Sequence, residues 1–223
     1  MLKIILTLLL ITSFNSFAVK LFKAEYNVFK DGKEIGISSI ELVKESPYYR
    51  IIDKTNGTHG MASFLGFKRS EISAFEEKDN NFFPESYEMK QKVAFKKRHS
   101  NFQTDTETQM VYGKHKGKQW QIKLPESFST PNLVSLNLSR DICAGLTDNL
   151  NYSVLKRGVL VTYQFKITST KDNIIEVDKI HSKPSRITKT WLDTKQNCIS
   201  IKTFHLEEGE DPLESKLKQV TFY

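Results

Sequence analysis

The sequence predicts a mainly β protein, with antiparallel strands in one curved sheet and a single helix packed on the concave face. Apolar and polar residues alternate along most of the chain, which is the pattern of strands that bury one face. Turn-forming pairs such as Asp31-Gly32 separate these segments. One segment after Thr130 has helical spacing instead. The length of 223 residues fits one large β domain after a leader.

Residues 1–18 have the composition of a signal peptide. Lys3 supplies a positive charge, an apolar run follows, and Ser16-Phe17-Ala18 offers the small residues that signal peptidase requires. The apolar run is too short to span a bilayer, and no cysteine lies at the cleavage site for lipid attachment. We therefore expect cleavage near Ala18 and a periplasmic chain, 19–223, that forms a single β-rich domain with no transmembrane segment.

Strands fill the first half of the mature chain. From Phe22 to Val28 every second residue is apolar, so one face packs while the other meets water. The turn at Asp31-Gly32 then returns the chain as a hairpin. The expected strands are 22–28, 34–44, 48–55, 68–77, 85–93 and 99–104.

The helix is predicted to follow Thr130, a candidate N-cap, with Pro131 at its first position. Its apolar residues fall on two sides, and a helix of that kind is usually buried between layers. We expect the helix to end near Gly145 or Asn149. One side is formed by Val134, Leu138, Ile142 and Leu146, and the other by Leu136 and Cys143.

The C-terminal part returns to alternation. Residues 159–167 give the clearest strand pattern in the chain, and segments 186–192, 198–204 and 215–223 are expected to complete the sheet. The last of these ends on Val220-Thr-Phe-Tyr223, so the C-terminus is predicted to be a strand and not a tail.

The chain has two cysteines, Cys143 and Cys198. In an oxidising compartment an even, low count favours a disulfide, and closing a loop of about 55 residues contributes about 4 kcal/mol in the chain-entropy model. Two separate buried thiols are the competing interpretation. A redox-active pair is disfavoured because the sequence has no Cys-x-x-Cys spacing.

The chain is basic, with a formal net charge of +7. For a periplasmic protein this charge favours lipid headgroups, lipopolysaccharide phosphates or acidic glycans as partners, and the compartment disfavours nucleic acid. Lysines that protect a sheet edge are the alternative explanation. The densest group, which we call the basic patch, comprises Lys90, Lys92, Lys96, Lys97 and Arg98.

No motif in the chain indicates catalysis. The five histidines are scattered singly, without the spacing of a metal site, and the Gly-x-Ser-x-Gly pattern of many hydrolases is missing. We therefore expect no enzyme activity, no metal and no cofactor, and keep hydrolysis of an envelope polymer only as a remote alternative.

One connection is unusually apolar. The segment 58–66 mixes glycines with Met61, Phe64 and Leu65, and Phe67 follows it. It fits a lid over an apolar cavity, a contact for a partner, or a loop folded over the end of the core.

The order of several motifs resembles one family. These motifs are Phe22-x-Ala24-x-Tyr26-x-Val28, Gly36, Ser70 within Lys68–Ile72, Phe83-Pro84-x-Ser86-Tyr87, Asn132–Leu138, Thr190–Asp193 and Ile199–Lys202. Together they resemble the bacterial exported family called domain of unknown function 3108. The resemblance implies a strongly curved antiparallel sheet or half-barrel similar to the lipoprotein carriers, with a helix on the inner face. It implies no catalytic residues.

These features favour a periplasmic protein that binds a lipid, a lipid-linked glycan or another amphipathic envelope component. A curved sheet around a helix creates a concave apolar space of the kind that holds a small ligand. An envelope assembly or scaffold protein, acting through protein contacts around 61–67 or 90–99, is the alternative. The sequence leaves the oligomeric state open. The candidate lining residues, which fit a filled core better than a ligand contact, are Tyr26, Val28, Leu138, Ile142, Tyr163 and Phe165.

Overall fold

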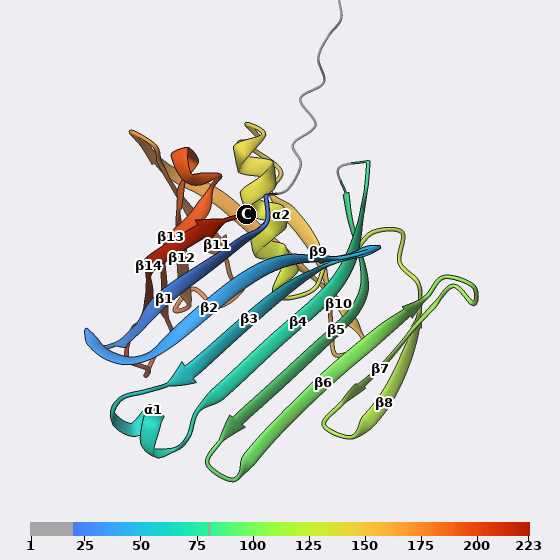
Figure 1. Cartoon of the computed structure of the whole chain (residues 1–223), viewed down its shortest axis with the longest axis horizontal. Helices are drawn as coiled ribbons and strands as arrows, with labels where there is room; N and C mark the ends of the chain where they lie inside the picture. Colours follow the sequence, from blue (N-terminus) through green and yellow to red (C-terminus); the bar gives the residue numbers. More distant parts are fainter. Residues whose placement is uncertain (1–19, 80) are drawn as a thin grey trace, which may run out of the picture.

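A computed structural model describes residues 20–79 and 81–223, so the predicted signal peptide lies outside the described part. The described chain forms a single sheet of fourteen strands (Figure 1). The strands are β1 (Phe22–Lys30), β2 (Lys33–Glu45), β3 (Tyr48–Gly57), β4 (Lys68–Lys78), β5 (Asn81–Val93), β6 (Lys96–Asp105), β7 (Met110–His115), β8 (Lys118–Lys123), β9 (Asn151–Lys156), β10 (Val159–Lys171), β11 (Ile174–Ile180), β12 (Ile187–Asp193), β13 (Ile199–Leu206) and β14 (Leu213–Phe222).

The sheet is antiparallel throughout and is not closed. Its order runs from β8 down to β1, continues through β14, and ends at β9. The pairing of β1 with β14 joins the two halves of the chain, with Phe22 opposite Phe222. The free edges are therefore β8 and β9, the two strands that flank the helical connection. The predicted curved antiparallel sheet is confirmed.

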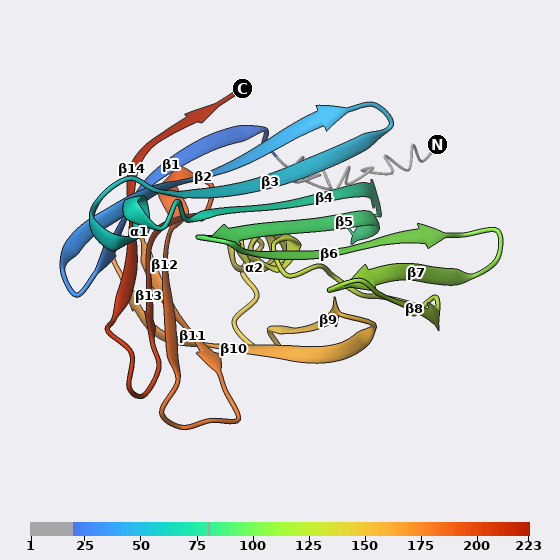
Figure 2. The ribbon, with the colours of Figure 1, turned by 90° about the horizontal axis from the view of Figure 1, so that it is seen from below.

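The principal helix lies inside the curve. Helix α2 (Leu133–Cys143) is enclosed between β4 to β6 on one side and β10 on the other (Figure 2). Leu133 and Leu136 pack with the inner residues of β1 to β5, whereas Leu138 and Ile142 pack against Val177 and its neighbours. Both sides of α2 are apolar because each side faces a different wall of the sheet. The predicted helix on the concave face is thus confirmed.

The ends of α2 lie within two residues of the prediction. The helix is regular from Leu133, and Thr130 caps its start: the Thr130 Oγ1 accepts a hydrogen bond from the Leu133 N–H (3.1 Å), and its carbonyl accepts one from the Val134 N–H (3.2 Å). It ends at Cys143, before Gly145, whose φ of +88° belongs to the left-handed region that glycine tolerates. Leu146 therefore lies beyond the helix and is 47% exposed.

A disulfide joins α2 to the sheet. Cys143, the last residue of α2, is bonded to Cys198, with 5.8 Å between the two Cα atoms. Cys198 immediately precedes β13 and is completely buried. The sequence left open whether these thiols are bridged, and the structure supports the bridge.

The gap between β8 and β9 is partly filled by the segment before α2. Ser129 forms a parallel bridge with Val154 of β9: its N–H donates to the Ser153 carbonyl (2.7 Å), and the Leu155 N–H donates to its carbonyl (3.0 Å). The Trp120 indole of β8 lies against Gly158, where a Cβ would come within 2.9 Å of the ring. The segment around Ser129 and the Trp120 side chain thus cover part of the gap between the two free edge strands, β8 and β9.

Two short helices complete the described chain. Helix α1 (Gly60–Phe64) connects β3 to β4, and the 3₁₀-helix η1 (Thr194–Gln196) connects β12 to β13. In the described residues no helix is long and apolar enough to cross a membrane.

Candidate ligand site

The interior of the curved sheet changes character along its length. On β3 and β4, the inner cross-strand pairs run from Tyr49 with Phe75, through Ile51 with Ser73, to Asp53 with Glu71. Tyr49 and Phe75 pack in an apolar cluster with α2, and Phe75 is almost fully buried in this cluster. Two strand residues further along, Thr55 is paired with Arg69. One end of the interior is therefore apolar and the other is polar and charged.

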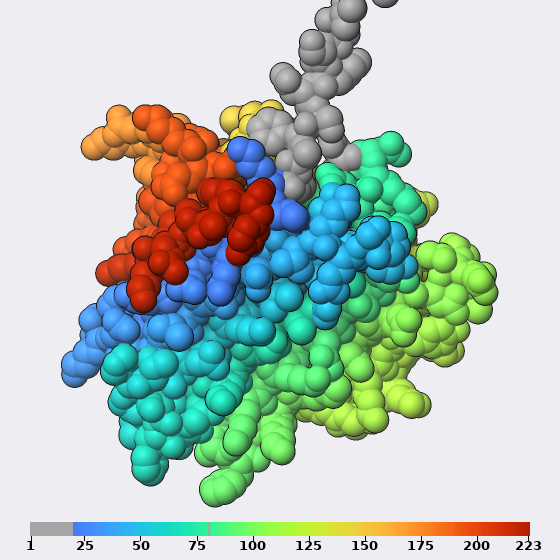
Figure 3. Space-filling model, viewed as in Figure 1, coloured from blue at the N-terminus to red at the C-terminus, as the bar shows by residue number. Residues whose placement is uncertain are grey.

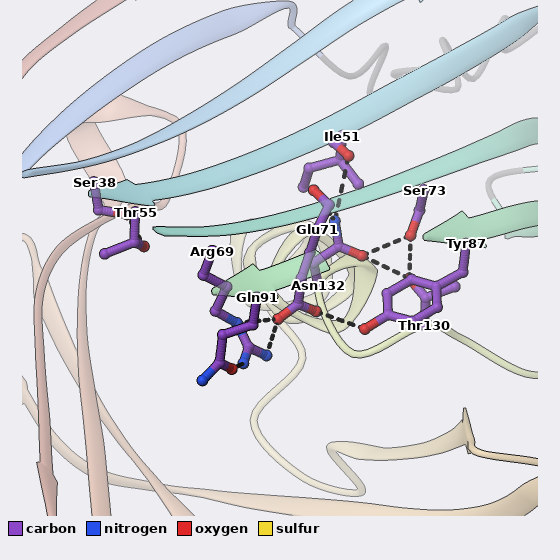
Figure 4. A network of polar contacts seen from close by, with 10 residues as sticks. All are labelled: Ser38, Ile51, Thr55, Arg69, Glu71, Ser73, Tyr87, Gln91, Thr130 and Asn132. Atoms are coloured by element: carbon purple, nitrogen blue, oxygen red, sulfur yellow. Dashed lines mark hydrogen bonds and ion pairs between the residues drawn. The ribbon is translucent and has the colours of Figure 1, made fainter. Parts of the chain in front are cut away.

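A polar network fixes the start of α2 between these ends (Figure 4). The Ser73 hydroxyl bonds to the hydroxyl of Thr130 (2.7 Å) and donates to the Asn132 Oδ1 (2.6 Å). The Asn132 amide donates to the backbone carbonyls of Ile51 (3.3 Å) and Glu71 (3.4 Å). This network satisfies buried polar groups and holds the helix N-terminus on β3 and β4, so its role is structural.

Beyond this network, two carboxyl groups face each other across β3 and β4. Glu71 accepts hydrogen bonds from the Arg69 guanidinium and from the Tyr87 hydroxyl (2.9 Å). Asp53 has no such partner: its Oδ1 is buried without a hydrogen bond. Burial, and then the charge of Glu71, raise the pKa of Asp53 well above its ordinary value, against the opposing effect of Arg69. This shift favours the protonated form of Asp53, which can donate a hydrogen bond as well as accept one.

Tyr26 adds a second buried polar atom without a partner. Its ring belongs to the core of β1, yet its hydroxyl forms no hydrogen bond in the described chain. Burial and the nearby charge of Asp53 raise the pKa of Tyr26, so its hydroxyl stays protonated. A buried hydroxyl and a buried carboxyl without partners are uncommon in a filled core and more typical of a site that receives water or a ligand.

The opposite wall supplies cations and aromatic rings. The Lys179 ammonium of β11 lies over the Tyr163 ring (2.9 Å to its centroid) and near the Phe165 ring (5.9 Å) of β10. Burial, and then the charges of Lys156 and Arg186, lower the pKa of Lys179 to about 8. Within the described chain Lys179 forms no ion pair.

The two walls act on each other electrostatically. Burial lowers the pKa of Lys156 in β9, as do Arg157 and the more distant Arg69, while Glu71 of β4 raises it. Burial and then Glu71 raise the pKa of Tyr163. These groups from both halves of the sheet are therefore close enough to influence one another's charge. We call this group the interior site, and it comprises Tyr26, Asp53, Arg69, Glu71, Lys156, Tyr163 and Lys179.

The structure brings the six predicted lining residues to the inner side. Leu138 and Ile142 are buried in the core around the disulfide, and Phe165 packs against that core. Tyr163 and Phe165 are half-buried beneath Lys179, and Val28 and Tyr26 are buried on β1. Their role as ligand contacts remains a prediction.

Sequence reasoning missed the charged members of the interior site. Asp53 and Glu71 occupy positions in phase with the buried residues Ile51 and Phe75, two and four residues away on their strands. The signal in the sequence was a charged residue at a position where the alternating pattern predicts a buried side chain. Lys179 carried no such signal, because its strand was not predicted.

The predicted basic patch lies at the same end of the sheet and divides between its two faces. Lys90, Lys92 and Lys97 lie on the outer face, where they join Lys54 and Lys68 around a groove of about 460 Å³. Arg98 is paired with Gln91, which accepts a hydrogen bond from Arg69 on the inner face. Lys96 is exposed at the start of β6. The structure thus enlarges the outer patch with two residues that sequence reasoning did not include.

A larger groove of about 790 Å³ also lies on the outer face, across β3 to β8. Its lining includes Arg50, Ile72, Glu88, Tyr112 and Lys114. In residues 20–79 and 81–223, no three His, Cys, Asp or Glu side chains are arranged to hold a metal ion.

Comparison with solved structures supports the fold. The chain is similar to the crystal structure of a beta-barrel-like protein of domain of unknown function DUF1849 from Brucella abortus, with a TM-score of 0.56. The sequences are 12% identical, and the match covers 92% of this chain and 98% of the other. At that identity the likeness shows a shared beta-barrel-like fold alone.

No family model matches the chain, and no curated protein matches it. The similar solved structure belongs to a different family of unknown function from the one that the sequence motifs suggest. The resemblance to domain of unknown function 3108 therefore remains a prediction.

Proposed function

We propose that this protein is a periplasmic carrier or binding protein that holds an anionic amphipathic envelope molecule, such as a lipid or lipid-linked glycan, in the interior site. The apolar part of the ligand would lie against the rings of Tyr163 and Phe165, and its anionic group would meet Lys179, Lys156 and Arg69. The activity proposed is binding without chemical conversion.

The observation that carries this proposal is the state of Lys179. Its ammonium is partly removed from water, lies between cationic neighbours, and has no ion-pair partner in the described chain. A buried cation without a counter-ion is unfavourable unless something else supplies the charge. A phosphate or carboxylate would supply that charge and would raise the pKa of Lys179 from about 8 towards its usual value.

Asp53 and Tyr26 support a polar headgroup and not a simple fatty acid. Each has a buried oxygen without a partner, and burial favours the protonated form of each, which can donate a hydrogen bond to a ligand hydroxyl or phosphate oxygen. Leaving such groups unpaired is unfavourable, and pairing them with a ligand recovers that energy.

Export to the periplasm is also part of the proposal. The disulfide between Cys143 and Cys198 supports it, because structural disulfides persist in oxidising compartments. The order of motifs that resembles domain of unknown function 3108, an exported family, supports it further.

Binding of short-chain lipids tests the proposal. The probes are dihexanoyl phosphatidylglycerol, which is anionic, and dihexanoyl phosphatidylcholine, which is zwitterionic, and native mass spectrometry measures bound lipid. We expect binding of the anionic lipid, and Lys179→Met should weaken it about tenfold, since a hydrogen-bonded charge contributes about 1.5 to 3 kcal/mol.

Lys166→Met is the matched control, because Lys166 lies on the adjacent strand β10 and is exposed to solvent. It removes the same charge and should leave binding unchanged. Equal binding of both lipids, or equal loss in both variants, would contradict the proposal. Protein purified from the periplasm without any bound lipid or glycan would favour the scaffold alternative.

A further inference from the structure

We propose that α1 and the turn between β5 and β6 form a docking tip that inserts into the surface of an anionic lipid bilayer. This proposal goes beyond ligand binding in the interior and does not depend on it. It rests on exposed apolar side chains, on the rigidity of the segments that carry them, and on a row of lysines beside them.

The apolar side chains of the tip are exposed to an unusual degree. Met61 is 66% exposed, Phe64 is 83% exposed, and Phe95 is fully exposed. Helix α1 has no buried residue at all, so its sequence is not explained by core packing. Single exposed apolar residues are ordinary, but three from two neighbouring segments form an apolar projection that favours a partner.

The two segments are joined and held in place. The Ala94 N–H in the β5–β6 turn donates to the Leu65 carbonyl just after α1 (2.6 Å). At the other side of α1, the Gly57 N–H donates to the Phe67 carbonyl (2.9 Å), and a Cβ at Gly57 would lie 2.5 Å from the Ala62 carbonyl oxygen. The tip is therefore a fixed platform that holds Phe64 and Phe95 outward. Figures 1 and 3 show α1 and this turn projecting together from the lower edge of the molecule.

A row of lysines borders the tip on the outer face of the sheet. Lys68, Lys92 and Lys97 are direct cross-strand neighbours on β4, β5 and β6. Like charges in such positions repel, which destabilises the sheet locally. All three are exposed, and none forms an ion pair in the described chain. With Lys96 at the start of β6 and Lys54 on β3, they concentrate positive charge beside the apolar projection.

The chemistry of this surface fits an anionic bilayer. Aromatic side chains settle at the boundary between headgroups and acyl chains, and lysines next to them attract lipid phosphates. Neither part alone binds a membrane firmly, but the two together give stable and reversible attachment. Two acidic groups oppose this attraction: Glu34, which lies 3.9 Å from the His59 imidazole beside α1, and Glu88 of β5, which pairs with Lys90.

The tip also lies at the polar end of the interior. Lys92 and Lys97 flank Gln91 and Arg98 in the strands, and Gln91 bonds to Arg69 of the interior site. A bilayer bound at the tip would therefore lie next to the end of the sheet where the interior site is located.

Vesicle flotation with the mature protein tests the proposal. The vesicles contain phosphatidylethanolamine and phosphatidylglycerol at about 7:3, and pure phosphatidylcholine vesicles provide the neutral comparison. We expect flotation with the anionic vesicles at low salt. The double variant Phe64→Ser with Phe95→Ser should reduce the bound fraction about tenfold or more, and Lys68→Glu with Lys97→Glu should do the same.

Two double variants serve as controls. Val159→Ser with Leu160→Ser removes exposed apolar residues in the β9–β10 hairpin, and Lys171→Glu with Lys195→Glu changes the same charge elsewhere. Both should float like the wild type. Thermal unfolding followed by circular dichroism should be unchanged in all four variants, because the substituted side chains are exposed.

Phe95→Trp gives a direct measurement of insertion. Its fluorescence emission should shift to shorter wavelength with anionic vesicles and stay unchanged with neutral ones. The proposal is overturned if the wild type does not float with anionic vesicles, or if the apolar and control variants float equally well. Loss in the charge variant alone would indicate an acidic macromolecule as the partner and would also overturn it.

Discussion

The two ends of the interior differ in how completely their groups are satisfied. At the end around α2, aromatic and aliphatic side chains fill the space, polar atoms such as those of Asn132 are hydrogen-bonded, and a disulfide holds the helix. At the other end, Asp53 and Tyr26 hold buried polar atoms without partners, and Lys179 lacks a counter-ion in the described chain. The first end stabilises the fold, whereas the second end retains unfavourable groups, as binding sites do.

The largest effect is expected from truncation at the filled end. Phe75 is almost fully buried and packs on Tyr49 (5.7 Å between ring centroids) and Phe82 (4.9 Å). Phe75→Ala should lower the free energy of unfolding by about 3 to 5 kcal/mol. Tyr163→Ala at the polar end should lower the free energy of unfolding by about 1 kcal/mol or less, because that ring is already half-exposed. Urea unfolding measures both, and equal losses would remove the distinction between the ends.

Loss of the disulfide should rank second. The double variant Cys143→Ser with Cys198→Ser opens a loop closed by residues 55 apart. We expect a decrease of about 2 to 4 kcal/mol in the free energy of unfolding. Binding of dihexanoyl phosphatidylglycerol should persist under conditions where the variant is folded, since the bridge lies at the filled end. Complete loss of binding in a folded variant would show that the two ends are coupled.

Asp53→Asn tests the polar end of the interior through the pH dependence of the free energy of unfolding. The pKa of Asp53 is higher in the folded state than in the unfolded state, so the folded state binds the proton more tightly. Its contribution to stability is present at low pH and decreases as the pH rises above about 4, by about 1.4 kcal/mol for each unit until the folded pKa is reached. Asp53→Asn should therefore gain stability relative to the wild type as the pH rises from 4 to 7.

Urea midpoints at pH 4, 5.5 and 7 measure this difference directly. The comparison between variant and wild type cancels the opposite contributions of Glu88, Glu176 and Glu214, whose pKa values are lowered by their lysine partners. A difference that stays constant with pH would show that Asp53 titrates normally.

The smallest effect is expected from Lys179. Its pKa of about 8 is below the unfolded value, so the folded state binds its proton less tightly and gains relative stability as the pH rises from about 8 to about 10.5. Lys179→Met should raise the free energy of unfolding at pH 7 by about 0.5 to 1 kcal/mol, a figure reduced because the group is partly exposed. Thermal unfolding at pH 7 and pH 10 checks this, and a destabilised variant at pH 7 would mean that the contact of the ammonium with the Tyr163 ring outweighs the cost of its burial.

Much of the sheet could be predicted from alternation. The segments 22–28 and 159–167 lie within β1 and β10, and the two apolar sides of α2 correctly placed the helix between layers. Strands β7, β8, β9 and β11 were missed. Three of these have six residues and the fourth has seven, too short for an alternating pattern to stand out from loops.

The interior site was less accessible to prediction. Its aromatic members Tyr26 and Tyr163 were found because they lie in the buried phase of strong strands. Arg69, Lys156 and Lys179 come from strands on opposite walls, and only the curvature of the whole sheet makes them face one another. The docking tip depends likewise on one backbone hydrogen bond between segments about 30 residues apart, which no local pattern reveals.

The pairing of β1 with β14 has a consequence for how the polypeptide reaches its native state. Residues at the two extremes of the described chain must meet, with Phe22 beside Phe222, before the sheet becomes continuous. Contacts so distant in sequence form slowly, and until then β1 presents an unpaired edge that invites intermolecular aggregation. Synthesis proceeds from the N-terminus, so this exposed edge stays unpaired until β14 is made, and the ten residues of β14 complete the sheet.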